Sequence, residues 1–98
     1  MIYLSGKISG LDREDYLSIF DYHEKKLQEV CGNIGIINPA KALDTLPKLE
    51  HWQYMAISLK LLELCDMIFM IPGWEDSEGA KIEFEFAKQN GYKLIQAL

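Results

Sequence analysis

The chain has 98 residues and a formal net charge of −5, from 15 acidic and 10 basic side chains. Its length leaves room for one domain, and 49% hydrophobic with 26% charged residues is typical of a globular protein, which excludes a disordered acidic tail and a collagen-like repeat. The acidic balance argues against a nucleic-acid polymer or an anionic membrane surface as partner, because both require a positively charged face.

Strand and helix patterns alternate along the chain. Short apolar runs are typical of strands, and longer segments with apolar residues about 3.6 apart are typical of helices. In chain order, the predicted elements are a strand over 2–5, a helix over 12–31, a strand over 34–37, a helix over 50–65, a strand over 67–71, a helix over 77–90 and a strand over 93–96. The segment over 39–49 is expected to be a loop.

This alternation predicts a three-layer α/β sandwich of the flavodoxin or Rossmann type, with a single domain over 1–98. The first three strand runs are almost continuously apolar, which favours a parallel sheet covered by helices on both faces. Right-handed crossovers favour four parallel strands in the order 2-1-3-4. The helix over 12–31 is expected to face this sheet with an apolar stripe that consists of Tyr16, Ile19, Phe20, His23, Leu27 and Val30.

The helix over 50–65 is apolar on two sides. One stripe consists of Trp52, Met55, Ala56, Leu59 and Leu62, and the other of Tyr54, Ile57, Leu61 and Leu64. A helix that is apolar nearly all round is buried nearly all round. We therefore expect one side to cover the sheet and the other to meet a second copy in a homodimer. The alternative is that the loop over 39–49 covers the second side.

The remaining global features concern location and cofactors. Cys31 and Cys65 lie among apolar residues and form no C-x-x-C motif, which predicts reduced thiols in a cytoplasmic protein. The longest apolar run, over 67–72, is too short to cross a bilayer, and the N-terminus lacks the charged region of a signal peptide. No histidine or cysteine spacing is typical of a metal site, so neither a metal nor a cofactor is expected.

The fold predicts where a ligand binds. Ligands of open α/β sheets bind beyond the carboxyl ends of the strands, near the point where the strand order reverses. Three loops meet at that edge in the predicted fold, over 5–10, 38–40 and 72–79, and they contain most of the glycines and several hydroxyl groups. A small-molecule site is therefore expected there.

One carboxylate lies on the apolar face of the helix over 77–90. The apolar arc of this helix consists of Ala80, Ile82, Phe84, Phe86 and Ala87. At about 100° per residue, Glu83 falls inside this arc and points toward the sheet. An unpaired buried carboxylate costs several kcal/mol. Glu83 is therefore either a hydrogen-bonded structural residue at the helix edge or the nucleophile or acid/base of a catalytic site.

Four segments carry a family resemblance. They are Ile2-Tyr3-Leu4-Ser5-Gly6, Asn38-Pro39, Cys65-Asp66, and the run from Ser77 to Glu83 together with Ala87. In this order, and over nearly the whole chain, the sequence resembles the nucleoside 2-deoxyribosyltransferase superfamily, which includes the deoxynucleoside 5′-monophosphate N-glycosidases. It is most similar to a branch of short bacterial and phage proteins, and the run that ends at Glu83 is the most specific part.

The resemblance implies roles for individual residues. Glu83 matches the nucleophilic glutamate that attacks C1′ of the sugar and forms a covalent glycosyl-enzyme intermediate, and Tyr3 matches the tyrosine that orients it. Ser77 matches the serine that binds a 5′-phosphate. Gly6 and Gly10 match the glycines that let the backbone approach the ligand. Together with the other loop positions, the expected substrate-binding residues are Gly6, Lys7, Ser9, Gly10, Asn38, Trp74, Asp76, Ser77 and Gly79.

The implied function is cleavage of the N-glycosidic bond of a deoxynucleoside or its 5′-monophosphate, by hydrolysis or by transfer to a second base. By spacing, Ser58 stands where the family usually has an aspartate that helps to protonate the leaving base, and Glu75 or Asp76 are the alternatives for that step. A second hypothesis is therefore a non-catalytic module that binds a nucleoside or nucleotide. A third is a structural adaptor dimer with a vestigial cleft.

Overall fold

The computed structural model describes residues 1–96. In chain order, the elements are β1 (Ile2–Ser5), α1 (Arg13–Cys31), β2 (Ile36–Ile37), α2 (Pro39–Leu43), α3 (His51–Glu63), β3 (Met67–Met70), the 3-10 helix η1 (Trp74–Asp76), α4 (Glu78–Gln89) and β4 (Lys93–Gln96). All predicted helices and strands are present, and the predicted helix bounds differ from the observed ones by at most two residues.

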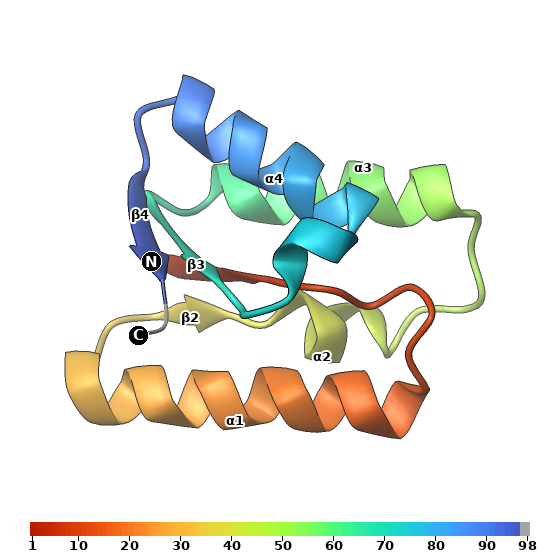
Figure 1. Cartoon of the computed structure of the whole chain (residues 1–98), viewed down its shortest axis with the longest axis horizontal. Helices are drawn as coiled ribbons and strands as arrows, with labels where there is room; N and C mark the ends of the chain where they lie inside the picture. Colours follow the sequence, from red (N-terminus) through yellow and green to blue (C-terminus); the bar gives the residue numbers. More distant parts are fainter. Residues whose placement is uncertain (97–98) are drawn as a thin grey trace.

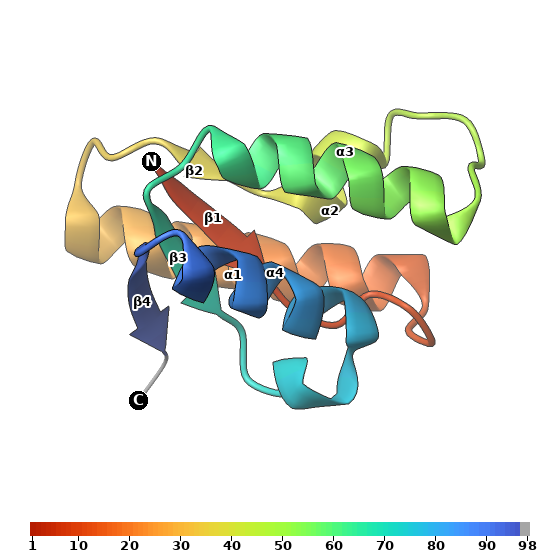
Figure 2. The same cartoon turned by 90° about the horizontal axis from the view of Figure 1, so that it is seen from above.

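The four strands form one parallel sheet in the order β2-β1-β3-β4. Helix α1 lies along one face of this sheet, and α3 and α4 lie over the other (Figure 1). Seen from above, α3 and α4 run side by side (Figure 2). The prediction of a layered α/β fold with this strand order is therefore confirmed. The strand order reverses direction at β1, which places the expected ligand crevice at the carboxyl ends of β1 and β3.

The second strand is shorter than predicted. The sequence favours a strand over 34–37, whereas β2 contains only Ile36 and Ile37, and Ile34 is exposed. The register explains the difference, because Ile36 pairs with Ile2 at the start of β1. Ile34 lies beyond the end of its partner strand and has no backbone to pair with.

Two short helices occupy segments that were predicted to be loops. Helix α2 begins at Pro39 directly after Asn38, whose Oδ1 accepts a hydrogen bond from the Lys41 amide at 3.1 Å. Asparagine at the N-cap followed by proline is a strong helix start, so this helix could be predicted from the sequence. Helix η1 follows Gly73, which has a left-handed φ of 94°.

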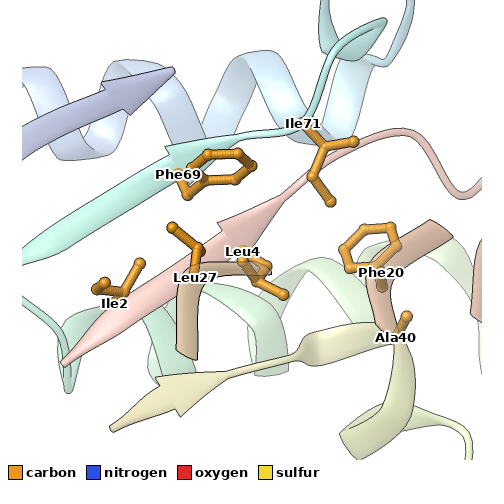
Figure 3. Close-up of a cluster of buried hydrophobic side chains, with 7 residues drawn as sticks. All are labelled: Ile2, Leu4, Phe20, Leu27, Ala40, Phe69 and Ile71. Carbon is orange, nitrogen blue, oxygen red and sulfur yellow. The ribbon is translucent and has the colours of Figure 1, made fainter. Parts of the chain in front are cut away.

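Side-chain alternation in β1 and β3 divides the core between the two faces of the sheet. The cluster on the α1 side consists of Ile2, Leu4, Phe20, Leu27, Ala40, Phe69 and Ile71 (Figure 3). The cluster on the α3 and α4 side consists of Tyr3, Leu62, Cys65, Ile68, Met70, Ala80 and Ala87. Tyr3 and Ser5 therefore both point toward α4, because they alternate with Ile2 and Leu4.

Some predicted core positions are exposed. Val30 and Ile19 on α1 are 82% and 39% exposed, so their placement in the buried stripe was wrong. For Val30 the cause is length, since a 19-residue helix is about twice as long as a four-residue strand and overhangs the sheet. Ile19 is next to buried Phe20 and lies at the edge of the stripe. On α4, Ile82 is also exposed.

Burial on α3 does not follow the two predicted apolar stripes. Leu62 of the first stripe is buried next to Ser58, whereas Trp52 of the same stripe is 69% exposed, and Ala56 and Leu64 are also exposed. The segment between α2 and α3 contacts Tyr54 of the second stripe through Pro47 and Leu49 and leaves Trp52 exposed. Among residues 1–96, no helix is both long enough and apolar enough to cross a membrane.

Candidate active site

A cavity of about 660 Å³ lies at the edge of the sheet where the strands end. Gly6, Ile8 and Ser9 from the loop after β1 line it, and so do Ser77 and Gly79 at the start of α4, after β3. The segments after β1 and β3 meet at the point where the strand order reverses, which is where the fold predicts a ligand.

The two sides of the cavity differ in polarity. The side formed by α1, α2 and the segments next to them is mainly apolar, and it consists of Ile8, Tyr16, Phe20, Pro39, Ala40, Leu43 and Leu46. The side formed by β1, α3 and the start of α4 carries most of the polar groups, which are Tyr3, His51, Tyr54, Ser58, Asp76, Ser77, Glu78 and Glu83. Ser9, Asp44 and Lys48 also line the cavity, from the segments next to α1 and α2. This pairing of an apolar surface with a few convergent polar groups is typical of a small-molecule site.

Glu83 forms the polar centre of the cavity. It lies on the second turn of α4 and is only 6% exposed. The Tyr3 hydroxyl donates a short hydrogen bond to Oε2, and the Ser5 hydroxyl donates to Oε1 at 2.7 Å. Each carboxylate oxygen therefore has its own donor, and both donors come from one face of β1.

Burial controls the protonation of this group. Removal from water raises the pKa of Glu83 to about 7, while the hydrogen bonds from Tyr3 and Ser5 act in the opposite direction. The same burial, reinforced by the nearby Glu83 carboxylate, raises the pKa of Tyr3 well above its ordinary value. Tyr3 thus remains a hydrogen-bond donor at neutral pH, whereas Glu83 changes its charge near neutrality.

Ser58 adds a third hydroxyl at this centre. It is buried on α3, and its hydroxyl acts on Tyr3 by lowering the pKa of that phenol, against the larger effect of burial. His51, Met55 and Ser58 follow one another along α3 at helical spacing and all line the cavity. Helix α3 therefore places Ser58 next to Tyr3. It also places His51, about two turns earlier in the helix, in the lining of the same cavity.

The expected substrate-binding residues divide into two groups. Gly6, Ser9, Asp76, Ser77 and Gly79 line the cavity, as do Tyr3 and Glu83. Lys7, Gly10, Asn38 and Trp74 do not line it.

Two residues of the second group have structural contacts instead. Asn38 caps α2, and its Nδ2 donates to Glu24 Oε1 at 2.9 Å. The Trp74 ring stacks on Phe84 with centroids 4.8 Å apart. The side chains of Asn38 and Trp74 are therefore already engaged in packing and capping.

Two of the lining glycines lie close to neighbouring side chains. A Cβ on Gly6 would lie 3.0 Å from Cβ of Ile71, and a Cβ on Gly79 would lie 3.0 Å from Sδ of Met55. Gly6 thus lets the chain that follows β1 pass close to Ile71, and Gly79 lets the first turn of α4 approach α3. Ser77 caps that turn, because its Oγ accepts a hydrogen bond from the Ala80 amide at 3.1 Å.

The sequence analysis missed several cavity residues. It also missed Ser5, which does not line the cavity but donates to Glu83. Ser5 was detectable, because a strand places residues two apart on the same face and Tyr3 was already assigned. Tyr16 and His51 lie on predicted helices, but periodicity does not show which helix ends meet. Lys48 lies in the segment between α2 and α3, where no local pattern predicts it.

That segment is held against α3 by Tyr54. The Tyr54 hydroxyl accepts a hydrogen bond from the Leu49 amide at 3.0 Å and donates to the Pro47 carbonyl at 3.3 Å. Arg13 anchors the same segment to the start of α1, because its Nε donates to Asp44 Oδ1 at 2.6 Å and its guanidinium lowers the pKa of that carboxyl. Within the described residues, no three His, Cys, Asp or Glu side chains gather as metal ligands would.

Comparison with known proteins identifies a family. Residues 1–96 match the family model described as Domain of unknown function (DUF4406). The chain belongs to this family. No curated protein and no solved structure gives a match. The match spans the whole of this DUF4406 domain from β1 to β4, so it includes every element that lines the cavity.

Proposed function

We propose that this DUF4406 domain cleaves the N-glycosidic bond of a deoxynucleoside or a deoxynucleoside 5′-monophosphate, as an N-glycosidase or a deoxyribosyltransferase. The observation that carries the proposal is Glu83, a buried carboxylate in a cavity of about 660 Å³ with a hydroxyl donor on each oxygen. The resemblance to the nucleoside 2-deoxyribosyltransferase superfamily supports it, because Glu83 and Tyr3 match the nucleophile and its orienting tyrosine.

The proposed reaction is a double displacement at C1′ of the sugar. A carboxylate oxygen of Glu83 forms a bond to C1′ as the C1′–N bond breaks and its electron pair goes to the leaving base. Water then attacks C1′ of the ester and gives its proton to the group that protonated the leaving base. The products are the free Glu83 carboxylate and deoxyribose, or deoxyribose 5-phosphate from a monophosphate. If a second base attacks in place of water, the product is a new nucleoside.

Tyr3 and Ser5 are positioning residues in this scheme. Their hydroxyl groups fix the carboxylate plane, and they favour its charged form in a site where burial disfavours it. A nucleophile that is already oriented does not lose conformational freedom at the moment of attack.

The leaving base needs a proton from another group. Ser58 stands where the nucleoside 2-deoxyribosyltransferase superfamily usually has an aspartate. A serine hydroxyl is not an acid near neutral pH, so Ser58 cannot supply this proton. Asp76 and His51 both line the cavity and both carry ionisable side chains. One of them, or solvent, supplies the proton in this proposal, and general acid catalysis is typically worth about 10²–10⁴-fold.

Ser58 also favours a second candidate function. A buried serine in place of an acid weakens leaving-group protonation without blocking the cavity. The alternative is a module that binds a nucleoside or nucleotide without cleaving it. Such a module keeps Glu83 as a hydrogen-bonding group for the sugar.

The proposal is tested by following base release from a panel of deoxynucleosides and their 5′-monophosphates by chromatography. Glu83→Gln keeps the size of the side chain and removes the nucleophile, so release is expected to fall by roughly 10³-fold or more. Glu85→Gln is the matched control on the exposed side of α4 and is expected to behave as wild type. Trapping the sugar on the wild-type chain, seen by mass spectrometry, identifies the covalent step.

Two results separate the candidate functions. Release that survives Glu83→Gln removes Glu83 as the nucleophile. Absence of release from every compound, together with thermal stabilisation by a nucleoside, supports the binding module.

We also infer a homodimer through α3 and a cytoplasmic location. The dimer is supported by three apolar residues of α3 and its C-cap that stay exposed in the single chain, which are Trp52, Ala56 and Leu64. The location is supported by Cys31 and Cys65, which are both free thiols.

A further inference from the structure

The start of α4 is the place in the cavity where an anionic group would bind. The first backbone amides of a helix carry a partial positive charge, and phosphate groups bind there in many proteins. Helix α4 has 12 residues, and its first turn lines the cavity through Glu78 and Gly79. Ser77, which matches the phosphate-binding serine of the monophosphate glycosidases, is its N-cap.

Two carboxylates flank this position. Asp76 and Glu78 are the neighbours of Ser77 on either side, and both line the cavity. Any phosphate held by Ser77 and the first turn of α4 would therefore lie beside two negative charges. Like charges repel each other, so Asp76 and Glu78 weaken the binding of a phosphate at this position.

The cations near these acids are held in ion pairs or come from another segment of the chain. Lys81 lies on the same helix but pairs with Glu78 at 3.6 Å and does not line the cavity. Arg13 is committed to Asp44 in a two-pronged ion pair. Of the lysines in the described part of the chain, Lys48 lines the cavity, and it comes from the segment between α2 and α3 rather than from α4.

We propose that the cavity selects a nucleoside without a 5′-phosphate, and that Asp76 and Glu78 are the specificity-determining residues that reject the monophosphate. This selectivity rests on the proposed function, and it narrows the substrate from two classes to one. The opposite side of the cavity fits the same conclusion. Its apolar residues, Phe20, Leu43 and Leu46 among them, suit an uncharged aromatic base.

The experiment compares kcat/KM for one deoxynucleoside and its 5′-monophosphate. The wild-type chain is expected to favour the nucleoside by roughly tenfold or more. The double variant Asp76→Asn with Glu78→Gln is expected to narrow this ratio by a similar factor, and so is high salt, because both acids are exposed and salt screens exposed charges. Glu85→Gln is the control, since Glu85 is exposed on α4 but does not line the cavity.

Three results overturn the selectivity. The first is a wild-type preference for the monophosphate. The second is a ratio that stays unchanged in the double variant. The third is a selective loss of monophosphate turnover in Lys48→Met, which identifies a phosphate partner on the other side of the cavity.

The test also separates this inference from the proposed function. If neither compound releases a base, the proposed function fails, and the dissociation constants of the two compounds decide the selectivity. Tighter binding of the nucleoside, reduced to parity in the double variant, supports the inference. Equal or tighter binding of the monophosphate, or no binding of either compound, overturns it.

Discussion

At the scale of single residues, the central feature is a carboxylate whose partners are neutral hydroxyl groups. Glu83 receives one hydrogen bond from Tyr3 and one from Ser5, and burial raises its pKa to about 7. A cation at the same place would hold the pKa far lower. The site therefore keeps a carboxylate that gains or loses a proton near neutral pH, which suits a nucleophile or an acid/base group.

Ser5 is expected to set the pH at which the carboxylate becomes active. Nucleophilic attack needs the ionised form, so base release by the wild-type chain should rise with pH and level off above about 7. Ser5→Ala removes the donor to Oε1, which disfavours the charge further. The acid limb of the pH–rate profile should then move up by about one pH unit, with a lower plateau.

The control for this prediction is Ser18→Ala on the exposed side of α1, which should leave the profile unchanged. A Ser5→Ala profile that overlies the wild-type profile would show that the hydrogen bond from Ser5 does not tune Glu83.

Glu83 is also expected to reduce stability at neutral pH. Its pKa is about 7 in the folded chain and 4.5 as the ordinary value, so the folded state binds more protons between these pH values. The contribution of this group to the free energy of unfolding therefore falls as pH rises from about 4.5 to about 7. Glu83→Gln lacks this loss, and its stability relative to wild type should increase by a few kcal/mol at most between pH 5 and pH 8.

Urea unfolding of both chains at pH 5 and pH 8 measures this change. The difference between the two chains is the relevant quantity, because all other titrating groups are shared. A difference that stays constant with pH would mean that Glu83 titrates normally in the folded protein.

At the scale of elements, the position of Glu83 depends on how closely α4 approaches its neighbours. Ala80 and Ala87 pack against the sheet, and Gly79 faces Sδ of Met55 on α3. Larger side chains at these positions would push α4 away and lengthen both hydrogen bonds to Glu83. Small residues on α4 are thus as important to the site as the polar ones.

Ser77 has a structural role that is independent of any ligand. Its Oγ caps the first turn of α4 through the Ala80 amide. Ser77→Ala should lower the free energy of unfolding by about 1 kcal/mol. Ser77→Asn should lower it much less, because asparagine is also a good N-cap. Chemical denaturation of the three chains checks this, and equal stability of Ser77→Ala and wild type would argue against the cap.

At the scale of the whole molecule, the winding of the chain creates the site. The chain moves from β1 to β2 on one side and from β1 to β3 on the other, so the segments after β1 and β3 separate and leave a crevice. Helices α1 and α2 supply most of the apolar lining of the cavity, and β1, α3 and the start of α4 supply most of its polar groups. No single element contains the site.

The exposed side of α3 is the surface expected to form the dimer. Sedimentation of the wild-type chain at micromolar concentration should give a dimer, and Trp52→Glu should shift it to monomer, because a charge at a buried interface is costly. Val30→Glu is the matched control, since Val30 is also an exposed apolar residue and lies on α1, away from α3. A wild-type chain that sediments as a monomer would contradict the prediction.

The sequence alone determined the four strands, the three long helices and the inward direction of Glu83. These properties follow from local periodicity, because a residue's place on a helix or strand face is fixed by its near neighbours. The same reasoning places Tyr3 and Ser5 together on one face of β1. The strand order follows from the right-handed crossovers that an alternation of strands and helices requires.

Only the tertiary structure decided what each face meets. The contacts of Glu83 with Tyr3 and Ser5 join residues 80 and 78 positions apart, and the approach of Ser58 and His51 to the cavity depends on how α3 lies on the sheet. The exposure of Val30 and Trp52 was likewise invisible to periodicity, because it depends on where the sheet ends. Packing between segments that are far apart in the sequence sets these contacts, and local sequence patterns do not predict that packing.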